Sequence, residues 1–392
     1  MPHQPDRRQF LVDCLALGLC AVSGPVRAEN TCLPYRGLVI LTAFADVALP
    51  VDQATVAERF RRLDRYVREM SYGRACVDVQ LSGWHTLPDP IGRYTISPIN
   101  LRVDKSRVTK LIQDAIDAAD TDADFSRYDY VVIYLGARFQ DYGMVGLCGY
   151  PGMLGWQQEL AFRTRSGQAV PGGVAIFTAT AHLGTLFHDS AHVWGGVHDG
   201  KRRVPCLYDH DLQIEHPTLD KGWPEALINM GYWDPMSCHS YKRHLPPPGL
   251  SSWTRLRLGW LPAEKIKVVE PGESTELLLA PLEDGQADTL VVRIPLSGKR
   301  YLLIENRQPI GQFDPYLPGH GVLIMRADDD IPECRHGRAP VRLIDADPSR
   351  KYLEGAAFDL PGRSRYADPE NGIEIELLEK LGLSYRIRIN RR

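Results

Sequence analysis

The chain has 392 residues, of which 44% are hydrophobic and 24% charged, and its net charge is −3 because 46 basic residues face 49 acidic ones. A chain of this length can bury cores of normal size in two or three domains. The nearly balanced charge argues against nucleic acid as a partner, because a nucleic-acid-binding chain usually carries a basic excess.

The N-terminus has the three ordered parts of an export signal. A twin arginine at 7–8 precedes an apolar stretch over 15–22, and Ala28 ends a cleavage-type segment. The pattern predicts a signal peptide over 1–28 and export to the periplasm or beyond by the twin-arginine route. The alternative is a flexible terminus that contains the arginine pair by chance. The apolar stretch is shorter than the roughly 20 residues that span a bilayer, so we expect no stable membrane insertion.

Apolar periodicity predicts alternating strands and helices in the first two thirds of the chain. Strands are predicted over 38–44, 77–87 and 130–135, and helices over 51–70, 107–119, 179–194 and 250–258. Beyond Pro262 the pattern changes to short β-rich runs separated by Gly, Pro and Asp. The sequence therefore predicts an α+β protein, with an α/β domain over 29–262 and an all-β domain, with a sandwich as the candidate architecture, over 263–392.

Six cysteines remain after the predicted signal, which permits up to three disulfides in an exported chain. The sequence cannot choose among the possible pairings. No two of these cysteines are spaced as C-x-x-C, so we expect neither a zinc site made of cysteines nor a thioredoxin-like redox site.

The segment from His188 to His198 has the spacing H-x-x-x-H-x-x-G-x-x-H. Residues four apart share one face of a helix, so His188 and His192 are predicted to point at one place. Gly195 and Gly196 would end the helix and let the chain bring His198 round as a third ligand. Three imidazoles and one water are typical of an open, catalytic Zn²⁺ site, and the spacing matches the long metzincin signature. The alternative is three ordinary, partly buried histidines with backbone partners.

The residue after the first histidine is Asp189, where this signature has the glutamate that activates the metal-bound water. Aspartate is one methylene shorter, which places its oxygen roughly 1.5 Å further from the water, and a general base must be within hydrogen-bond reach. Asp189 either acts as the base after a small shift or through a second water, or the protein binds metal with little turnover.

A tight turn around Met236 supports the metal site, because metzincins carry a methionine turn beneath their zinc ligands. Alone, Met236 would be an ordinary core residue. Tyr241 and His239 follow this turn and are the candidates for stabilising the oxyanion of a hydrolytic reaction. The competing interpretation makes both of them surface loop residues.

Several short motifs, in order, resemble the immune inhibitor A family of secreted metallopeptidases. They are Glu69–Gly73, Gly83–Pro88, Asp124–Asp129, Asp234–Ser237, Leu250–Trp253, Leu258–Leu261, Tyr301–Gln308 and Leu317–Ile324. The resemblance implies a zincin-type α/β catalytic domain, zinc-dependent peptide hydrolysis and export, with His188 and His192 as ligands. Many relatives have an acidic third ligand, so His198 departs from the family and Asp199 is the nearest acidic substitute.

The same resemblance raises the question of calcium. Relatives often carry an acidic, glycine-rich insert after the Arg-Tyr-Asp segment, whereas here Asp129 runs directly into Tyr130. Asp120, Asp122 and Asp124 could form a Ca²⁺ loop, but calcium requires six to eight oxygen ligands. A solvated acidic turn is the alternative.

Two functions follow from these residues. The first is a secreted zinc metalloendopeptidase that acts on a protein or peptide substrate, with Asp189 as general base. The second is a metal-containing module that binds a peptide or protein without cutting it. Neither a serine-hydrolase G-x-S-x-G motif nor a nucleotide-binding glycine motif occurs. The oligomeric state and the cleavage specificity are not determined by the sequence.

Overall fold

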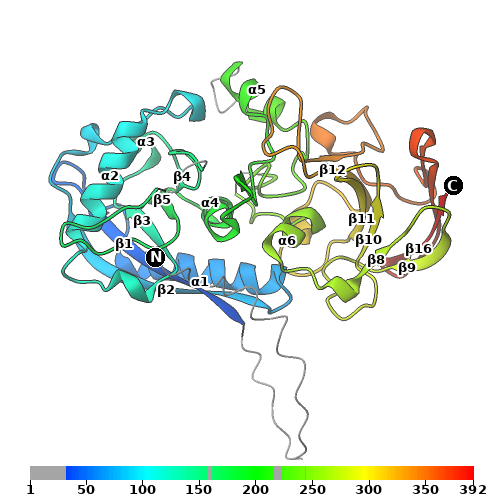
Figure 1. The fold of residues 1–392 in the computed structure, drawn as a ribbon, viewed down its shortest axis with the longest axis horizontal. Coiled ribbons are helices and arrows are strands. Elements are labelled where there is room, and N and C mark those ends of the chain that lie inside the picture. The colour runs from blue at the N-terminus through cyan, green and yellow to red at the C-terminus, as the bar shows by residue number, and fades with distance from the viewer. Residues whose placement is uncertain (1–31, 157–159, 216–222, 243) are drawn as a thin grey trace, which may run out of the picture. The chain divides into compact units, whose positions relative to one another are not determined.

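A mixed five-stranded sheet forms the N-terminal part of the structure, a computed structural model that describes residues 32–156, 160–215, 223–242 and 244–392. The predicted signal peptide lies outside the described residues. In spatial order the strands are β2 (Ala75–Thr86), β1 (Leu33–Ala43), β3 (Tyr130–Leu135), β5 (Val174–Thr178) and β4 (Gly146–Tyr150). The first four pair in parallel, and β4 is an antiparallel strand at the edge (Figure 1).

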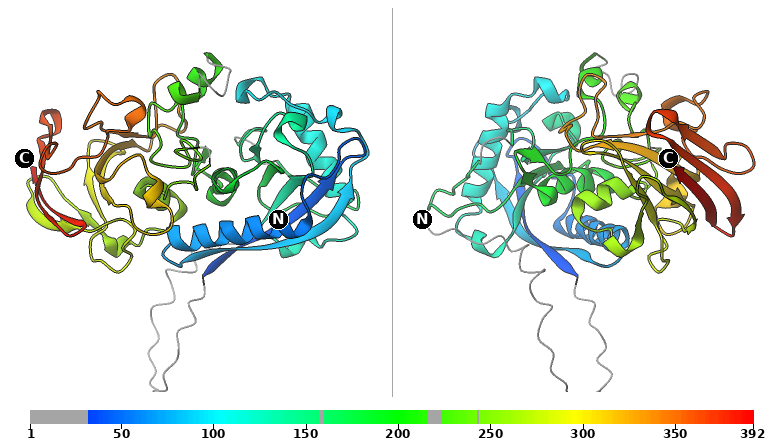
Figure 2. Two further views of the ribbon diagram at one scale, coloured as in Figure 1. Left: turned by 180° about the vertical axis from the view of Figure 1, so that it is seen from behind. Right: turned by 45° about the vertical axis from the view of Figure 1, so that its right-hand side comes forward.

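The central strands of this sheet send alternate side chains into two separate cores. In β1, Val39 belongs to the core on one face and Ile40 to the core on the other, as the two-residue period of a strand requires. Helices α1 (Gln53–Met70) and α4 (Leu183–Gly195) cover the first face, and α2 (Lys105–Ala118) covers the second (Figures 1 and 2). Strands covered on both faces need apolar residues throughout, which is why they stand out in the sequence.

Short elements connect these layers. They are α3 (Phe139–Tyr142), α5 (His210–Glu215), α6 (Ser252–Leu258), the hairpin of β6 (Val197–His198) and β7 (Lys201–Arg202), and single turns of 3-10 helix at Ile91–Arg93, Asn100–Arg102, Phe125–Arg127, Trp223–Ala226, Ala263–Lys265, Asp314–Tyr316, Lys351–Leu353 and Pro369–Asn371. The long helices begin where the sequence supplies a cap. Asp52 starts α1 by accepting the backbone N–H of Thr55, and Asp104 starts α2 in the same way.

Two further sheets form the C-terminal part, where the sequence predicts β structure. One has the order β13 (Val341–Leu343), β12 (Gly321–Asp328), β11 (Arg300–Arg307), β10 (Val291–Pro295) and β8 (Ile266–Val268), and the other has the order β14 (Arg365–Asp368), β15 (Ile373–Leu381), β16 (Ser384–Arg391) and β9 (Ser274–Leu279). Side chains from both sheets, such as Ile304 and Ile387, share one core. The two sheets therefore pack face to face as a sandwich.

The sheet that contains β11 also contributes to the core around α1 and α4. Leu303 and Leu323 lie in one hydrophobic cluster with Phe60 of α1 and Phe187 of α4. Residues 32–392 accordingly form a single compact unit, and the domain boundary at 262 stays a prediction. The architecture is α+β, as expected from the sequence, with β strands alone forming the C-terminal sheets.

One disulfide links Cys32 to Cys76, and so fastens the start of β1 to the start of β2. The other cysteines of the described chain are buried thiols that form no disulfide: Cys148, Cys206, Cys238 and Cys334. A structural disulfide is typical of proteins outside the cytosol. Within the described residues, none of the helices combines the length and the apolar character that crossing a membrane requires.

Candidate metal centre

Helix α4 places two histidines side by side in the interior. His188 and His192 are four residues apart, and their ring centroids lie 4.8 Å from each other. The side chains are nearly inaccessible to solvent, with relative exposures of 3% and 2%. The helix is mostly apolar and buried along its length from Gly184 to Gly195. Burial lowers the pKa of both imidazoles, which favours the neutral form that binds metals.

Backbone carbonyls orient both rings in the same way. His188 donates its Nδ1–H to the carbonyl of Pro235 at 2.9 Å, and His192 donates its Nδ1–H to the carbonyl of Val204 at 2.6 Å. Since a carbonyl can only accept, the proton of each neutral ring is on Nδ1 and the lone pair is on Nε2. A second ring nitrogen held by a carbonyl is the usual environment of a metal-binding histidine.

Cys206 completes the group. Its Sγ lies 3.6 Å from Nε2 of His188 and 3.4 Å from Nε2 of His192, and one ligand atom from each of the three residues fits within a span of 4.8 Å. Tetrahedral zinc with bonds of about 2.3 Å to sulfur and about 2.05 Å to nitrogen separates those atoms by about 3.6 Å. The spacing therefore fits a bound Zn²⁺, and two imidazoles with one thiolate suit that metal.

Tyr208 gives the cysteine an outer partner. Its ring stacks on His188 at a centroid distance of 6.0 Å, and its hydroxyl is within hydrogen-bonding reach of Cys206. The same hydroxyl accepts a hydrogen bond from the side chain of Asn100 at 2.8 Å. Each of the three ligand side chains thus has a second-layer contact that fixes its orientation.

The predicted methionine turn lies directly against these ligands. Asp234 closes the turn by accepting the N–H of Ser237 on its carbonyl at 2.9 Å and the N–H of Met236 on its carboxylate at 2.8 Å. The turn supplies the Pro235 carbonyl that holds His188, and the Met236 carbonyl accepts the N–H of Leu207 at 2.8 Å. It therefore positions one histidine and the segment that carries Cys206.

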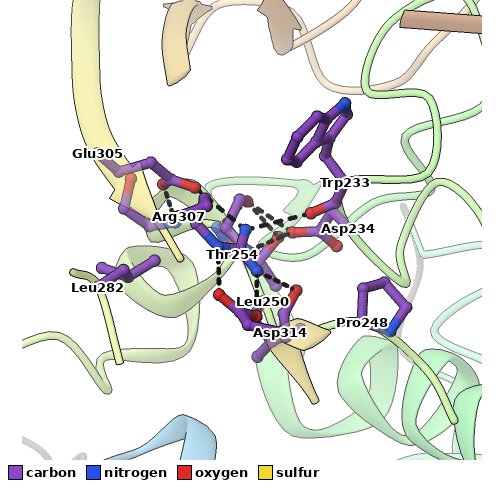
Figure 3. A network of polar contacts seen from close by, with 12 residues as sticks. Trp233, Asp234, Pro248, Leu250, Thr254, Leu282, Glu305, Arg307 and Asp314 are labelled. Carbon is purple, nitrogen blue, oxygen red and sulfur yellow. Dashed lines mark hydrogen bonds and ion pairs between the residues drawn. The ribbon is translucent and has the colours of Figure 1, made fainter. Parts of the chain in front are cut away.

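A buried charge network fastens this turn to the C-terminal sheets (Figure 3). Arg307 of β11 forms a double hydrogen bond with Asp314 at 2.8 and 2.7 Å, and it also donates to Glu305 and to the carbonyl of Trp233. Asp234 accepts hydrogen bonds from the side chains of Ser251 and Thr254 at 2.5 and 2.7 Å. The metal-site turn is thus built partly by residues of the β-rich region.

His198 does not join the trio, which corrects the predicted ligand set. It lies on the β6–β7 hairpin with a side-chain exposure of 75%, and its nearest charged neighbour is Asp199 at 3.5 Å. The hairpin leaves α4 at Gly196 and returns beside it, where the N–H of Arg203 bonds to the carbonyl of Gly196 at 3.0 Å. Arg202 anchors it through a double contact with Glu333 at 2.8 and 2.7 Å. The chain therefore leads away from His188 and His192 at position 198 and returns to them at Cys206.

A local signal in the sequence could have shown this. Asp199 and Gly200 both have positive φ, of 50° and 70°, and Asp-Gly is a strong signal for a two-residue hairpin turn. A hairpin at this point places His198 in a strand that leads away from the helix. Cys206 has no C-x-x-C partner, and one thiolate can join two histidines without such a motif.

No protein-family model matches this chain, and no curated protein matches it.

Asp189 is buried beside the trio, next to the edge strand β4. The backbone N–H of Cys148 in β4 bonds to its carboxylate, while burial raises the pKa of Asp189 to about 6 against the opposing effects of His188 and that N–H. A side chain at Gly146 would come within 2.8 Å of its Oδ2. The carboxylate is thus close to the metal ligands, and one of its oxygens is held by β4.

The two oxyanion candidates lie in different surroundings. His239 packs on His188 at a centroid distance of 4.7 Å, and burial is the main cause of its lowered pKa. Tyr241 instead contacts Tyr232 at 5.2 Å and is half-buried. The structure brings His239 to His188, whereas Tyr241 packs against Tyr232.

The acidic residues considered for calcium form turns. Asp120 accepts the N–H and the hydroxyl of Ser166, both at 2.7 Å, and the amide of Gln168 at 2.9 Å. Asp124 caps a short turn by accepting from Ser126. Among the described residues, the group that can hold a metal is the one at His188, His192 and Cys206.

Proposed function

We propose that this protein is a zinc-dependent hydrolase that cuts peptide bonds, with His188, His192 and Cys206 as the metal ligands. The observation that carries the proposal is that two Nε2 lone pairs and one sulfur converge inside the protein, while both Nδ1–H groups are bound by carbonyls. Three protein ligands leave a fourth position of a tetrahedral zinc for water or substrate, which is the arrangement of catalytic sites.

In this proposal a metal held by these three residues would polarise the scissile carbonyl and would lower the pKa of a water molecule to about 7. Asp189 would be the general base that accepts a proton and passes it to the leaving amine. The N–H of Cys148 holds one of its carboxylate oxygens, so the other is the one available to the water. His239, packed against His188, is a candidate to contact the substrate oxygen.

A concave surface near the start of α4 supports a binding role. A recess of about 430 Å³ is lined by Arg62, Arg65, Leu183, Pro246 and Phe313, among others. Leu183 is the first residue of α4, and Pro246 belongs to the loop that follows His239. The recess therefore lies at the N-terminal end of α4, where a side chain of a bound peptide could be accommodated.

The finer assignments belong to the same proposal. The motifs that resemble those of immune inhibitor A-type metallopeptidases support a zincin-like fold, in which an active-site helix carries metal ligands and a methionine turn lies beneath them. The disulfide between Cys32 and Cys76 and the twin arginine at 7–8 support export by the twin-arginine route.

The second candidate, a metal-binding protein with little turnover, is favoured by one observation. Cys148 uses its N–H for Asp189 and its carbonyl for the N–H of Met153, at 2.8 Å. The part of β4 nearest the metal ligands is therefore already bonded, and a peptide could not add to it as a further strand at this residue.

Substitution of Asp189 separates the two candidates. Purified protein would be analysed for zinc and assayed for casein digestion with and without a chelator. We expect one zinc per chain, chelator-sensitive digestion, and a loss of about 100-fold or more in kcat for Asp189→Asn with the zinc retained, since a general base contributes about that much.

Asp189→Glu tests the length of the side chain. If reach limits the rate, the longer residue raises kcat, by up to about 100-fold. Full zinc content with no digestion by either the wild type or Asp189→Glu would contradict the hydrolase proposal and favour the binding module.

A further inference from the structure

A second polar cluster lies beside the metal ligands and is not part of the trio. Thr185, in the first turn of α4, is buried, and its Oγ1 lies 3.3 Å from Nε2 of His182 and 3.1 Å from Nδ1 of His239. One hydroxyl therefore links two imidazoles that come from different segments of the chain. The second of these imidazoles packs on the metal ligand His188.

The protons in this cluster can be assigned from the helix end. His182 is the N-cap of α4, and its Nδ1 accepts the backbone N–H of Gly184 at 3.2 Å. Its own proton is therefore on Nε2, from which it donates to Thr185 Oγ1. The hydroxyl must direct its single proton elsewhere, and among the described residues the acceptor within hydrogen-bond distance is Nδ1 of His239.

This assignment leaves His239 with its proton on Nε2. Within the described part of the chain, that nitrogen has no hydrogen-bond partner, and the side chain is partly exposed. The loop that carries His239 passes close to α4, since a Cβ at Gly184 would come within 2.1 Å of the His239 carbonyl. The contact with Thr185 orients the ring through Nδ1, and its Nε2–H is directed to no residue of the described chain.

We propose that His239 donates a hydrogen bond, through its Nε2–H, to the substrate that binds at the metal centre. Thr185 and His182 are positioning residues that select this tautomer. The substrate is a carboxyl derivative, such as a peptide bond. Its carbonyl oxygen, which gains negative charge during addition, accepts the hydrogen bond. The donor role rests on the proposed hydrolysis, whereas the tautomer does not.

The tautomer is measured directly by nitrogen-15 NMR of the full chain labelled at histidine, both metal-free and zinc-loaded. We expect His239 to have a proton on Nε2 and none on Nδ1. Thr185→Val removes the hydroxyl and should abolish this preference, whereas Thr185→Ser keeps the hydroxyl and should preserve it. A proton on Nδ1 of His239 in the wild type would overturn the proposal whether or not the protein cuts peptides.

The donor role is tested by a matched pair of substitutions. A glutamine places an N–H close to the position of Nε2, whereas an asparagine reaches only as far as Nδ1. We expect His239→Asn to lower kcat for casein by about 100-fold and His239→Gln to recover much of it, with KM and zinc content unchanged, because removal of one oxyanion donor has about that effect. Thr185→Val should lower kcat by a much smaller factor, about 2-fold when the proton is shared equally between the two nitrogens.

A binding assay keeps this test independent of turnover. Acetohydroxamate, a small metal chelator with a carbonyl-type oxygen, would be titrated into the zinc-loaded variants. We expect His239→Asn to weaken its binding about 10-fold and His239→Gln to weaken it less. Unchanged acetohydroxamate affinity in His239→Asn overturns the donor role. If the variants differ in acetohydroxamate affinity as expected but the wild type does not digest casein, only the proposed hydrolysis is contradicted.

Discussion

Two of the buried polar clusters in the described chain differ in whether the protein completes them. Around Arg307, all five N–H groups of one guanidinium have acceptors: two oxygens of Asp314, one of Glu305, and the carbonyls of Trp233 and Gly249 (Figure 3). In the metal trio, two lone pairs and a sulfur face one another, and one thiol proton cannot satisfy all three. This group of two imidazole nitrogens and one sulfur can hold a metal ion, whereas the Arg307 network is complete as it stands.

The two clusters meet at one turn. Trp233 accepts from Arg307, Asp234 accepts from Ser251 and Thr254, and Pro235 accepts from His188. The Arg307 network therefore supports the turn that holds His188 of the trio. We expect substitutions in the first to change stability, and substitutions in the second to change metal binding.

The largest effect is expected at Arg307. Arg307→Met leaves the carboxylates of Asp314 and Glu305 buried without their partner, which costs about 3–5 kcal/mol of unfolding free energy. Urea denaturation of the zinc-loaded protein measures this. Arg388→Met is the control, because its contacts with Glu276 and Glu376 are largely exposed and should contribute about 0–1 kcal/mol. Equal losses in the two variants would contradict the special role of the network.

The next effect concerns the third ligand. Cys206→Ala removes one of three donors, and we expect the zinc affinity to fall by more than the roughly 10–100-fold typical of outer-shell changes. Chelator competition measures the affinity, and cobalt substitution adds a thiolate-to-metal absorption band that should vanish in the variant. His198→Ala is the matched control and should bind zinc like the wild type. If His198→Ala loses zinc and Cys206→Ala keeps it, the predicted site of three histidines is correct.

A smaller effect is expected from the phenol next to the cysteine. Tyr208→Phe removes the hydroxyl within reach of Cys206 and should weaken zinc binding about 10-fold. Tyr241→Phe alters a phenol whose ring contacts Tyr232, so zinc affinity and casein digestion should both stay unchanged. Loss of digestion in Tyr241→Phe would show that this tyrosine takes part in the reaction after all.

Much of the scaffold could be predicted because it depends on local patterns. Strand β3 was predicted at its observed ends, and α1 and α4 were predicted within a few residues, because apolar periodicity and caps act over short distances. The edge strand β4 was not predicted. It is only five residues long and contains two glycines, so its pattern is weak, and its pairing with β5 depends on residues that follow it by about thirty positions.

The sequence by itself determined the pair His188 and His192, because helix geometry makes residues four apart neighbours whatever surrounds them. It also determined the turn at Met236, through a short local motif. Only the tertiary structure decided which residue joins these two histidines, since the choice between His198 and Cys206 depends on where the hairpin after Gly196 leads the chain. The hairpin is held by Glu333, more than a hundred residues later in the sequence, and no local spacing contains that information.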